Sequence, residues 1–296
     1  MVSSIVICNG VIRSGSTWSF NVCRLLASLR AKRRGEPFVS NYVFGNQLDD
    51  FLNTSAPVRQ GSAVLKAHTV GPLALEWIRT ARAKSVCTFR DPRDCVASEM
   101  EFEAVNFDTA IARVVACLKT LESSMDFGRT LFIRYEDMMH DRMSQIRLIA
   151  AYLNVRVDEK ELESIDNETN LATSKKLCSQ ISTLGPDQVE KIDNVPARHR
   201  TTLLHDHHIS KARPGRWRED LTDAQGRHLM QLFQKALLLL GYETQESIRS
   251  YLLTPPADAL ASITSPRQEP AGQAAAGATA GNKIGHIGSS HSLPPA

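Results

Sequence analysis

The amino-acid sequence lacks three features that would each point to a broad class of protein. It contains no run of 18 or more apolar residues, which excludes a membrane-spanning helix. Its 35 basic and 32 acidic residues leave a formal charge of only +3, so charge gives no argument for a nucleic-acid partner. Its six cysteines form no C-x-x-C pair, so neither a zinc site nor a disulfide framework is indicated. We expect reduced, mostly buried thiols in a cytoplasmic protein.

The composition changes after Leu253. From Thr254 to Ala296, 29 of 43 residues are Ala, Gly, Pro, Ser or Thr, and none is aromatic. Such a segment cannot bury enough apolar surface to offset the entropy lost on ordering, so we expect residues 254–296 to be a disordered tail. Residues 1–253 are expected to form one domain. Its first ten residues predict a strand and lack the basic and long apolar regions of a signal peptide.

Short apolar runs and amphipathic segments alternate along residues 1–253. The runs that predict strands are Ile5–Cys8, Ala63–Leu65, Val86–Phe89 and Leu131–Ile133. The segments with helical periodicity are Thr17–Leu29, Asp108–Met125, Ser144–Leu153 and Asp223–Leu240, the last preceded by a capping box of Thr222 and Gln225. The alternation predicts an α/β fold with three layers, in which helices cover both faces of a mostly parallel sheet. In such sheets ligands bind at the carboxyl ends of the strands.

The loop after the first expected strand has the composition of an anion-binding site. Residues Gly10–Thr17 match the phosphate-loop frame G-x-x-x-x-G-K-[ST], except that Ser16 replaces the lysine and Arg13 supplies a cation three positions earlier. Gly15 lets backbone amides turn inward, and the helix N-terminus adds unpaired N–H groups beside the hydroxyls of Ser16 and Thr17. A plain Gly/Ser turn would explain the glycine, but not the cation and the two hydroxyls.

Residues Ile12–Trp18 resemble the 5′-phosphosulfate loop, P-K-S-G-T-T-W, of sulfotransferases that use 3′-phosphoadenosine-5′-phosphosulfate (PAPS). Ile12 stands in place of the proline, and Arg13 in place of the lysine. The cofactor contacts that the resemblance implies here are Arg13, Ser14, Gly15, Ser16, Thr17 and Trp18. Considered alone, Trp18 is either a core residue or a ring that stacks on a purine.

Two more expected strands end in residues of the same family pattern. Arg90, with Ser98 eight positions later, resembles the 3′-phosphate signature, and a guanidinium fork and a hydroxyl can both donate to a phosphate. A helix start with ion pairs among residues 90–94 is the alternative. Lys66-Ala-His68 resembles a K-T-H stretch, which implies His68 as the general base and Lys66 near the departing phosphate. Neutral imidazole can accept a hydroxyl proton, although a histidine without a functional role is the alternative.

Two later segments complete the resemblance, which covers about residues 1–245. Phe132–Asp137 resembles a strand that ends in Y-E-D and implies Tyr135 near the adenine, with a structural acidic pair as an equal alternative. Ser210–Trp217 resembles the loop R-K-G-x-x-G-D-W, from which it departs at three positions. The implied contacts to the 3′-phosphate side of the cofactor are Lys211, Ala212 and Arg213.

These motifs together predict a PAPS-dependent sulfotransferase with a P-loop-like fold. The expected reaction moves a sulfuryl group from PAPS to a hydroxyl, or in second place an amine, of a small acceptor, and releases PAP. His68, Arg13 and Lys66 are the expected catalytic residues, and no metal is required. Positioning and electrostatics carry most of such a transfer.

Two other interpretations remain open, a P-loop kinase for nucleotides or small molecules and a non-catalytic protein that binds PAP or another nucleotide. Ser16 in the lysine position counts against the kinase, and the presence of His68 counts against the non-catalytic protein. The acceptor stays open, because Arg13 resembles the carbohydrate-type branch of the family and Lys66-Ala-His68 the branch that acts on phenols and alcohols. The oligomeric state has no signal in the sequence.

Overall fold

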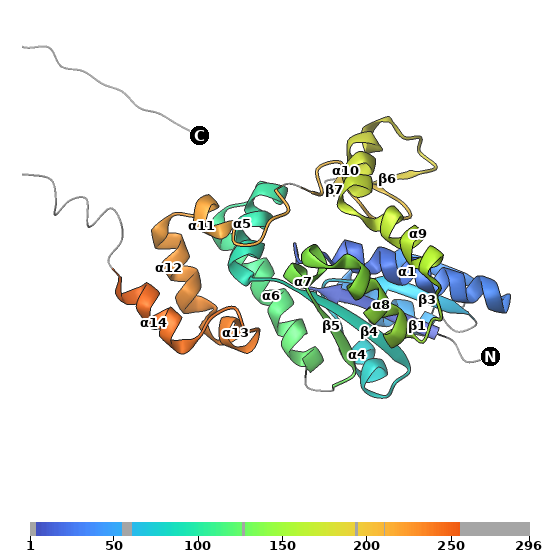
Figure 1. Ribbon diagram of the computed structural model, residues 1–296, viewed down its shortest axis with the longest axis horizontal. Coiled ribbons are helices and arrows are strands. Elements are labelled where there is room, and N and C mark those ends of the chain that lie inside the picture. The colour runs from blue at the N-terminus through green and yellow to red at the C-terminus, as the bar shows by residue number, and fades with distance from the viewer. Residues whose placement is uncertain (1–3, 55–60, 126–127, 193–194, 210, 255–296) are drawn as a thin grey trace, which may run out of the picture. The chain divides into compact units, whose positions relative to one another are not determined.

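A parallel sheet forms the centre of the protein, for which the computed structural model describes residues 4–54, 61–125, 128–192, 195–209 and 211–254 (Figure 1). The expected tail therefore lies, apart from Thr254, outside the described residues. The sheet has the order β2–β3–β1–β4–β5, and all neighbouring strands are parallel. The strands are β1 (Ser4–Gly10), β2 (Phe38–Tyr42), β3 (Ser62–Lys66), β4 (Ala83–Phe89) and β5 (Thr130–Arg134).

The four predicted strands are all present, and β2 is an edge strand that the sequence pattern did not indicate. Its residues are half-buried or exposed, and its only apolar pair, Phe38 and Val39, is too short to predict a strand. A second small sheet pairs β6 (Val189–Ile192) with β7 (Val195–His199) in antiparallel orientation.

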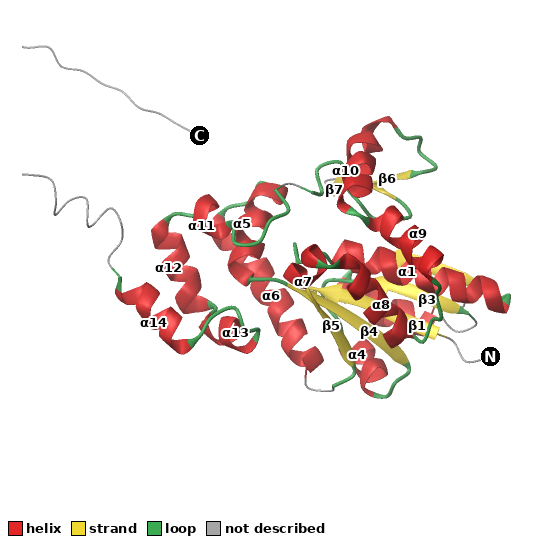
Figure 2. Ribbon diagram, viewed as in Figure 1, coloured by secondary structure: helices red, strands yellow, loops and turns green. Residues whose placement is uncertain are grey.

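Helices account for most of the remaining described residues (Figure 2). They are α1 (Ser16–Arg34), α2 (Leu48–Thr54), α4 (Pro72–Arg79), α5 (Pro92–Glu103), α6 (Phe107–Met125), α7 (Tyr135–His140), α8 (Arg142–Leu153), α9 (Glu159–Thr169), α10 (Leu171–Gln180), α11 (Trp217–Asp220), α12 (Asp223–Leu232), α13 (Gln234–Leu239) and α14 (Gln245–Leu253), with single 3-10 turns at Gly45–Gln47 and Ile181–Thr183. The predicted capping box of Thr222 and Gln225 starts α12. The predicted helix over 223–240 is interrupted at Phe233, whose ψ of 11° is not helical.

Helices cover both faces of the sheet, which confirms the predicted three-layer α/β class. Val6 and Cys8 of β1 face a core formed with α1, α8 and α9. Ile5 and Ile7 alternate with them and face a second core formed with α2 and α4. The β4 side of this second face packs against α5, α6 and α12.

Burial on both faces explains why the central strands are almost wholly apolar. All six cysteines are free and buried, as predicted. Within the described ranges, no helix is both long enough and apolar enough to cross a membrane.

Candidate active site

One cavity of about 670 Å³ opens at the carboxyl edge of the sheet. Each of the five strands delivers a side chain to it at its end or just beyond: Arg13 after β1, Tyr42 of β2, Lys66 of β3, Arg90 after β4 and Tyr135 after β5. The parallel topology therefore brings residues from four of the predicted motifs together in one cavity, along with Tyr42 of β2, a segment in which the sequence analysis found no motif.

The phosphate-like loop after β1 is anchored to the neighbouring strand by a glycine and a serine. Gly10 has a φ of +147°, and a Cβ added to it would lie 2.5 Å from the carbonyl oxygen of Thr88, so only glycine fits. The Ser14 hydroxyl donates to the carbonyl oxygen of Val11 at 2.5 Å and lies 2.7 Å from the Thr88 hydroxyl. The side chain of Ser14 is thus turned into the protein and does not line the cavity, in contrast to the other predicted residues of this loop.

The start of α1 faces the cavity. Gly15 precedes the helix with a φ of +87°, and the next residues, Ser16 and Thr17, line the cavity in the first turn, where N–H groups lack helical partners. A helix N-terminus with two hydroxyls favours a bound anion. Trp18 combines both of its possible roles, because its ring packs against the core and also lines the cavity.

Arg13 and Ser98, which are 85 residues apart in the sequence, are in direct contact. Arg13 Nε donates to Ser98 Oγ at 3.2 Å, and Arg13 Nη2 donates to the carbonyl oxygen of His208 at 2.8 Å. Its guanidinium carbon lies 3.9 Å from the ring centre of Phe102. The first and second predicted motifs therefore form one cluster.

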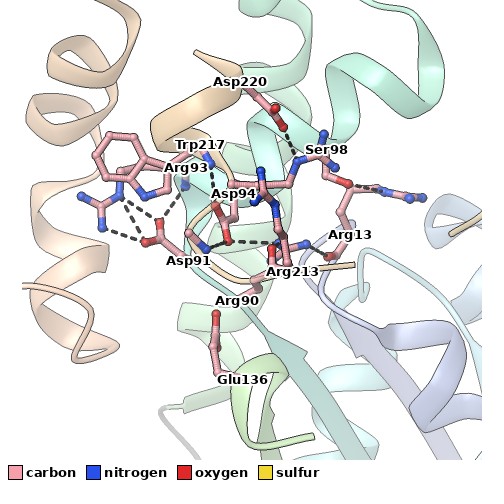
Figure 3. Close-up of polar contacts among 12 residues, drawn as sticks. Arg13, Arg90, Asp91, Arg93, Asp94, Ser98, Glu136, Arg213, Trp217 and Asp220 are labelled. Carbon is pink, nitrogen blue, oxygen red and sulfur yellow. Dashed lines mark hydrogen bonds and ion pairs between the residues drawn. The ribbon is translucent and has the colours of Figure 1, made fainter. Parts of the chain in front are cut away.

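Arg90 lies beside Arg13 and is buried with 3% of its surface exposed. Its Nη2 donates to Asp94 Oδ2 at 3.0 Å and to the carbonyl oxygen of Arg213 at 2.6 Å, and its Nη1 donates to the carbonyl oxygen of Arg13 at 3.3 Å (Figure 3). Its guanidinium carbon lies 4.2 Å from the ring centre of Tyr135. Arg90 Nε is buried and has no hydrogen-bond partner in the part of the chain that the structure describes, so one donor of this cation remains for a ligand.

The ion pairs that the sequence offered as an alternative are also formed. Asp91 caps α5 and accepts from Arg93 Nη2 at 2.7 Å, while Asp94 accepts from Arg90 and from the backbone N–H groups of Gly215 and Trp217 (Figure 3). Helix capping and presentation of Arg90 to the cavity are thus two properties of one segment.

Lys66 and His68 are neighbours at the end of β3. Lys66 Nζ lies 3.5 Å from His68 Nε2, and His68 Nδ1 lies 3.4 Å from the carbonyl oxygen of Gly10. A proton on Nδ1 directed at this carbonyl leaves the lone pair on Nε2. Burial, and then the charges of Arg198 and Arg13, lower the pKa of Lys66 to about 7. Burial and the nearby Lys66 lower the pKa of His68 to about 3, so the imidazole is neutral at pH 7.

The loop before α11, which the sequence analysis compared with the R-K-G pattern, contributes fewer side chains to the cavity than the sequence indicated. Ala212 lines the cavity, but Lys211 pairs with Asp220 and Arg213 pairs with Glu219, and neither of these cations is among the lining side chains. The two carboxylates of α11 lie six to nine residues after their partners and draw the side chains outward. Ser210 lies outside the described residues.

Several lining residues had no signal in the sequence analysis. Tyr42 and Phe44 come from the segment around β2, and Phe102 lies one helical turn after Ser98, on the same face of α5. His208 belongs to the stretch His205-Asp-His-His208, whose concentration of imidazoles was the only available hint.

Comparison with known proteins identifies the family of the chain. A family model described as a sulfotransferase domain matches residues 4–241. The structure is similar to that of a mouse sulfotransferase complexed with PAP, with 14% identity, a TM-score of 0.56 and coverage of 85% of this chain and 88% of the other. It is also similar to retinol dehydratase in complex with androsterone and inactive cofactor PAP, with 16% identity, a TM-score of 0.54 and coverage of 79% and 80%. The chain therefore belongs to the sulfotransferase domain family.

Proposed function

We propose that the protein transfers a sulfuryl group from PAPS to a hydroxyl group, or in second place an amine, of a small acceptor and releases PAP. The observation that carries this proposal is the presence of two sets of groups that can donate hydrogen bonds to phosphates, both in the lining of one cavity and linked through Arg13. The first set is the start of α1 with Ser16 and Thr17, and the second is Arg90 with Ser98. Two sets fit a nucleotide with phosphates at both its 5′ and 3′ positions.

The chemistry of the donor set fits PAPS. The amides and hydroxyls at the start of α1 would hold the 5′-phosphate, and the unpartnered Nε of Arg90 would donate to the 3′-phosphate. Trp18 and Tyr135 provide rings for the adenine. PAPS itself supplies the activated sulfuryl group. Arg13 and Lys66 would stabilise the charge that develops on the leaving phosphate oxygen.

His68 would take the proton of the acceptor hydroxyl. Its hydrogen bond to Gly10 orients the imidazole, and its neutral state at pH 7 leaves a lone pair free to accept. A pKa of about 3 makes a weak base, but phosphate charges beside Lys66 oppose the main electrostatic cause of this shift.

The kinase alternative lacks support in the site. A kinase needs a carboxylate that is free to hold magnesium. Asp91, the first carboxylate after β4, accepts the backbone N–H, Nε and Nη2 of Arg93 instead. A second phosphate site at Arg90 would also stay unpaired with ATP, whose phosphates form a single 5′ chain.

Thermal unfolding with PAP and with ATP–Mg²⁺ tests the proposal. At 100 times its dissociation constant, PAP should stabilise the fold by about 2.7 kcal/mol, a rise of roughly 5–10 °C in Tm. Arg90→Ala should lose most of this rise, whereas Arg147→Ala, which removes an arginine that is 47% exposed, should keep it. A larger rise with ATP–Mg²⁺ than with PAP would contradict the proposal.

A screen for transfer of labelled sulfate from PAPS to phenols, alcohols, sugars and lipids then separates an enzyme from a non-catalytic binder. Turnover of any acceptor supports the proposed reaction. Tight PAP binding without turnover across the whole screen would favour the non-catalytic alternative.

A further inference from the structure

The imidazole of His208 lines the cavity together with those of His68 and His205, and nothing in the proposed reaction yet uses it. It lies in the loop between β7 and α11 and lines the cavity. Its carbonyl oxygen accepts from Arg13 Nη2 at 2.8 Å, which fixes the backbone at this point. Besides burial, Arg13, Lys66, His205 and His68 all lower the pKa of the His208 ring, so the ring lies near the three expected catalytic groups.

The ring of His208 is held in place by other rings. It stacks on His205 with 5.4 Å between ring centres and an angle of 4°, and it meets Phe102 edge-on at 5.6 Å. Such contacts restrict the ring to one orientation. His208 is therefore a fixed group rather than a mobile side chain at the cavity wall.

The two ring nitrogens of His208 have different surroundings. Nδ1 is buried and has no hydrogen-bond partner among the described residues. Burial, followed by the charges of Arg13 and Lys66, lowers the pKa of His208 far below its usual value, so the ring carries a single proton at pH 7. Buried N–H groups without an acceptor are rarer than unpaired acceptors, which favours the proton on Nε2. A fixed, neutral N–H donor results.

A neutral donor at this position suits the acceptor better than the sulfate donor. Arg13 and Lys66 already provide charged groups for the phosphosulfate. The cavity lining includes both polar groups, such as His205, and apolar side chains, among them Phe102, Leu204 and Ile209. A fixed hydrogen-bond donor discriminates between ligands, because a ligand without the matching acceptor atom leaves the donor unpaired.

We propose that His208 is a specificity-determining residue that donates a hydrogen bond from Nε2 to a second oxygen atom of the acceptor. The preferred acceptors are then compounds with an apolar body and two oxygens, one that reacts at His68 and one that binds His208. This inference rests on the proposed function, because it assumes that the acceptor occupies this cavity.

Binding to the PAP-saturated protein tests the inference without turnover. Calorimetry would compare phenol with the 1,2-, 1,3- and 1,4-benzenediols, and cyclohexanol with the matching cyclohexanediols, so that the oxygen spacing is scanned. We expect at least one diol to bind about tenfold more tightly than its parent alcohol, the range that one well-placed hydrogen bond provides. The preference would be overturned if no diol bound more tightly than its parent.

Three variants assign the effect to His208. His208→Phe keeps a ring against Phe102 and His205 but removes the donor, and should bring the diol and its parent within about twofold of each other. His208→Gln retains an N–H donor and should restore part of the preference. His140→Ala is the control, because His140 is an exposed histidine of α7 that does not line the cavity. Equal losses for diol and parent in His208→Phe would overturn the specificity role.

Sulfate transfer with the same compounds distinguishes the two proposals. If diols bind through His208 but none is sulfated, the inference stands and the proposed reaction loses support. If acceptors are sulfated with no diol preference in the parent protein, the reaction stands and the role of His208 is refuted.

Discussion

Lys66 allows a quantitative prediction of how PAP binding depends on pH, because its pKa of about 7 lies more than three units below the ordinary 10.5. It is 5% exposed and has no carboxylate partner among the hydrogen bonds and ion pairs of the described residues. Phosphate groups bound beside it would favour the charged form and raise the pKa again. Binding of PAP should therefore take up a proton wherever Lys66 is neutral in the free protein.

The size of the effect follows from the protonated fraction of Lys66. With a pKa of about 7 this fraction is about one half at pH 7 and about one hundredth at pH 9. If the bound state keeps the proton, the affinity for PAP should fall about 50-fold over this interval, or about 2.3 kcal/mol. The phosphates of PAP, with a second pKa near 6, add little above pH 7.5.

The free energy of unfolding of the free protein should rise with pH, whereas its affinity for PAP should fall. Between pH 7 and 10.5 the unfolded chain keeps a proton on Lys66 that the folded chain has lost, so the free energy of unfolding rises with pH in this window. The slope attributable to this residue is at most about 1.4 kcal/mol per pH unit. Stability and PAP affinity would therefore diverge as the solution becomes more alkaline.

Calorimetry at pH 7, 8 and 9 in buffers of different ionisation enthalpy would measure both the affinity and the proton uptake. Lys66→Met should remove the pH dependence of both PAP affinity and stability that comes from this site. Lys66→Arg keeps the charge and should also give a flat affinity profile. A parent protein with no proton uptake at pH 8, or a Lys66→Met variant with the same pH profile as the parent, would refute the argument.

Two further predictions concern His68 and Asp94. His68→Ala should lower kcat by roughly 10²–10⁴ with PAP affinity within a few-fold of the parent, as measured with labelled PAPS and by calorimetry; full turnover would exclude His68 as the base. Asp94→Asn should lower the free energy of unfolding by about 3 kcal/mol in denaturant titrations, because it leaves the charge of buried Arg90 without its carboxylate. Glu159→Gln, at an ion pair with 70% exposure, is the control and should change it by less than about 0.5 kcal/mol; equal effects of the two substitutions would contradict the role of Asp94.

The sequence predicted the parts of the fold that are set by burial. Strands β1, β3, β4 and β5 are short apolar runs because helices cover both faces of the sheet. Strand β2 escaped prediction because Ser40 and Asn41 interrupt its apolar pattern at the sheet edge. The same applies to β6 and β7, which are too short for a periodic signal.

The site was predictable where one residue type is required at one spacing. Ser16, Thr17 and Arg90 follow strands and Lys66 ends one, and the parallel topology alone brings strand ends together. Phe102 and His208 could not be found this way, because their place depends on helix packing and on the path of a long loop. Lys211 and Arg213 were predicted from their place in the motif, but the sequence did not show that Asp220 and Glu219 would pair with their side chains.

The contacts of Arg13 and Arg90 with the loop of residues 208–213 have a consequence for how that loop can change. Within this loop, both guanidinium groups donate to carbonyl oxygens, those of His208 and Arg213. Every amino acid carries such a carbonyl, so substitution within the loop can leave these contacts intact while an insertion or deletion would break them. The constraint falls on chain length and path more than on side-chain identity, which allows this loop to depart from the R-K-G pattern and still close against the two arginines.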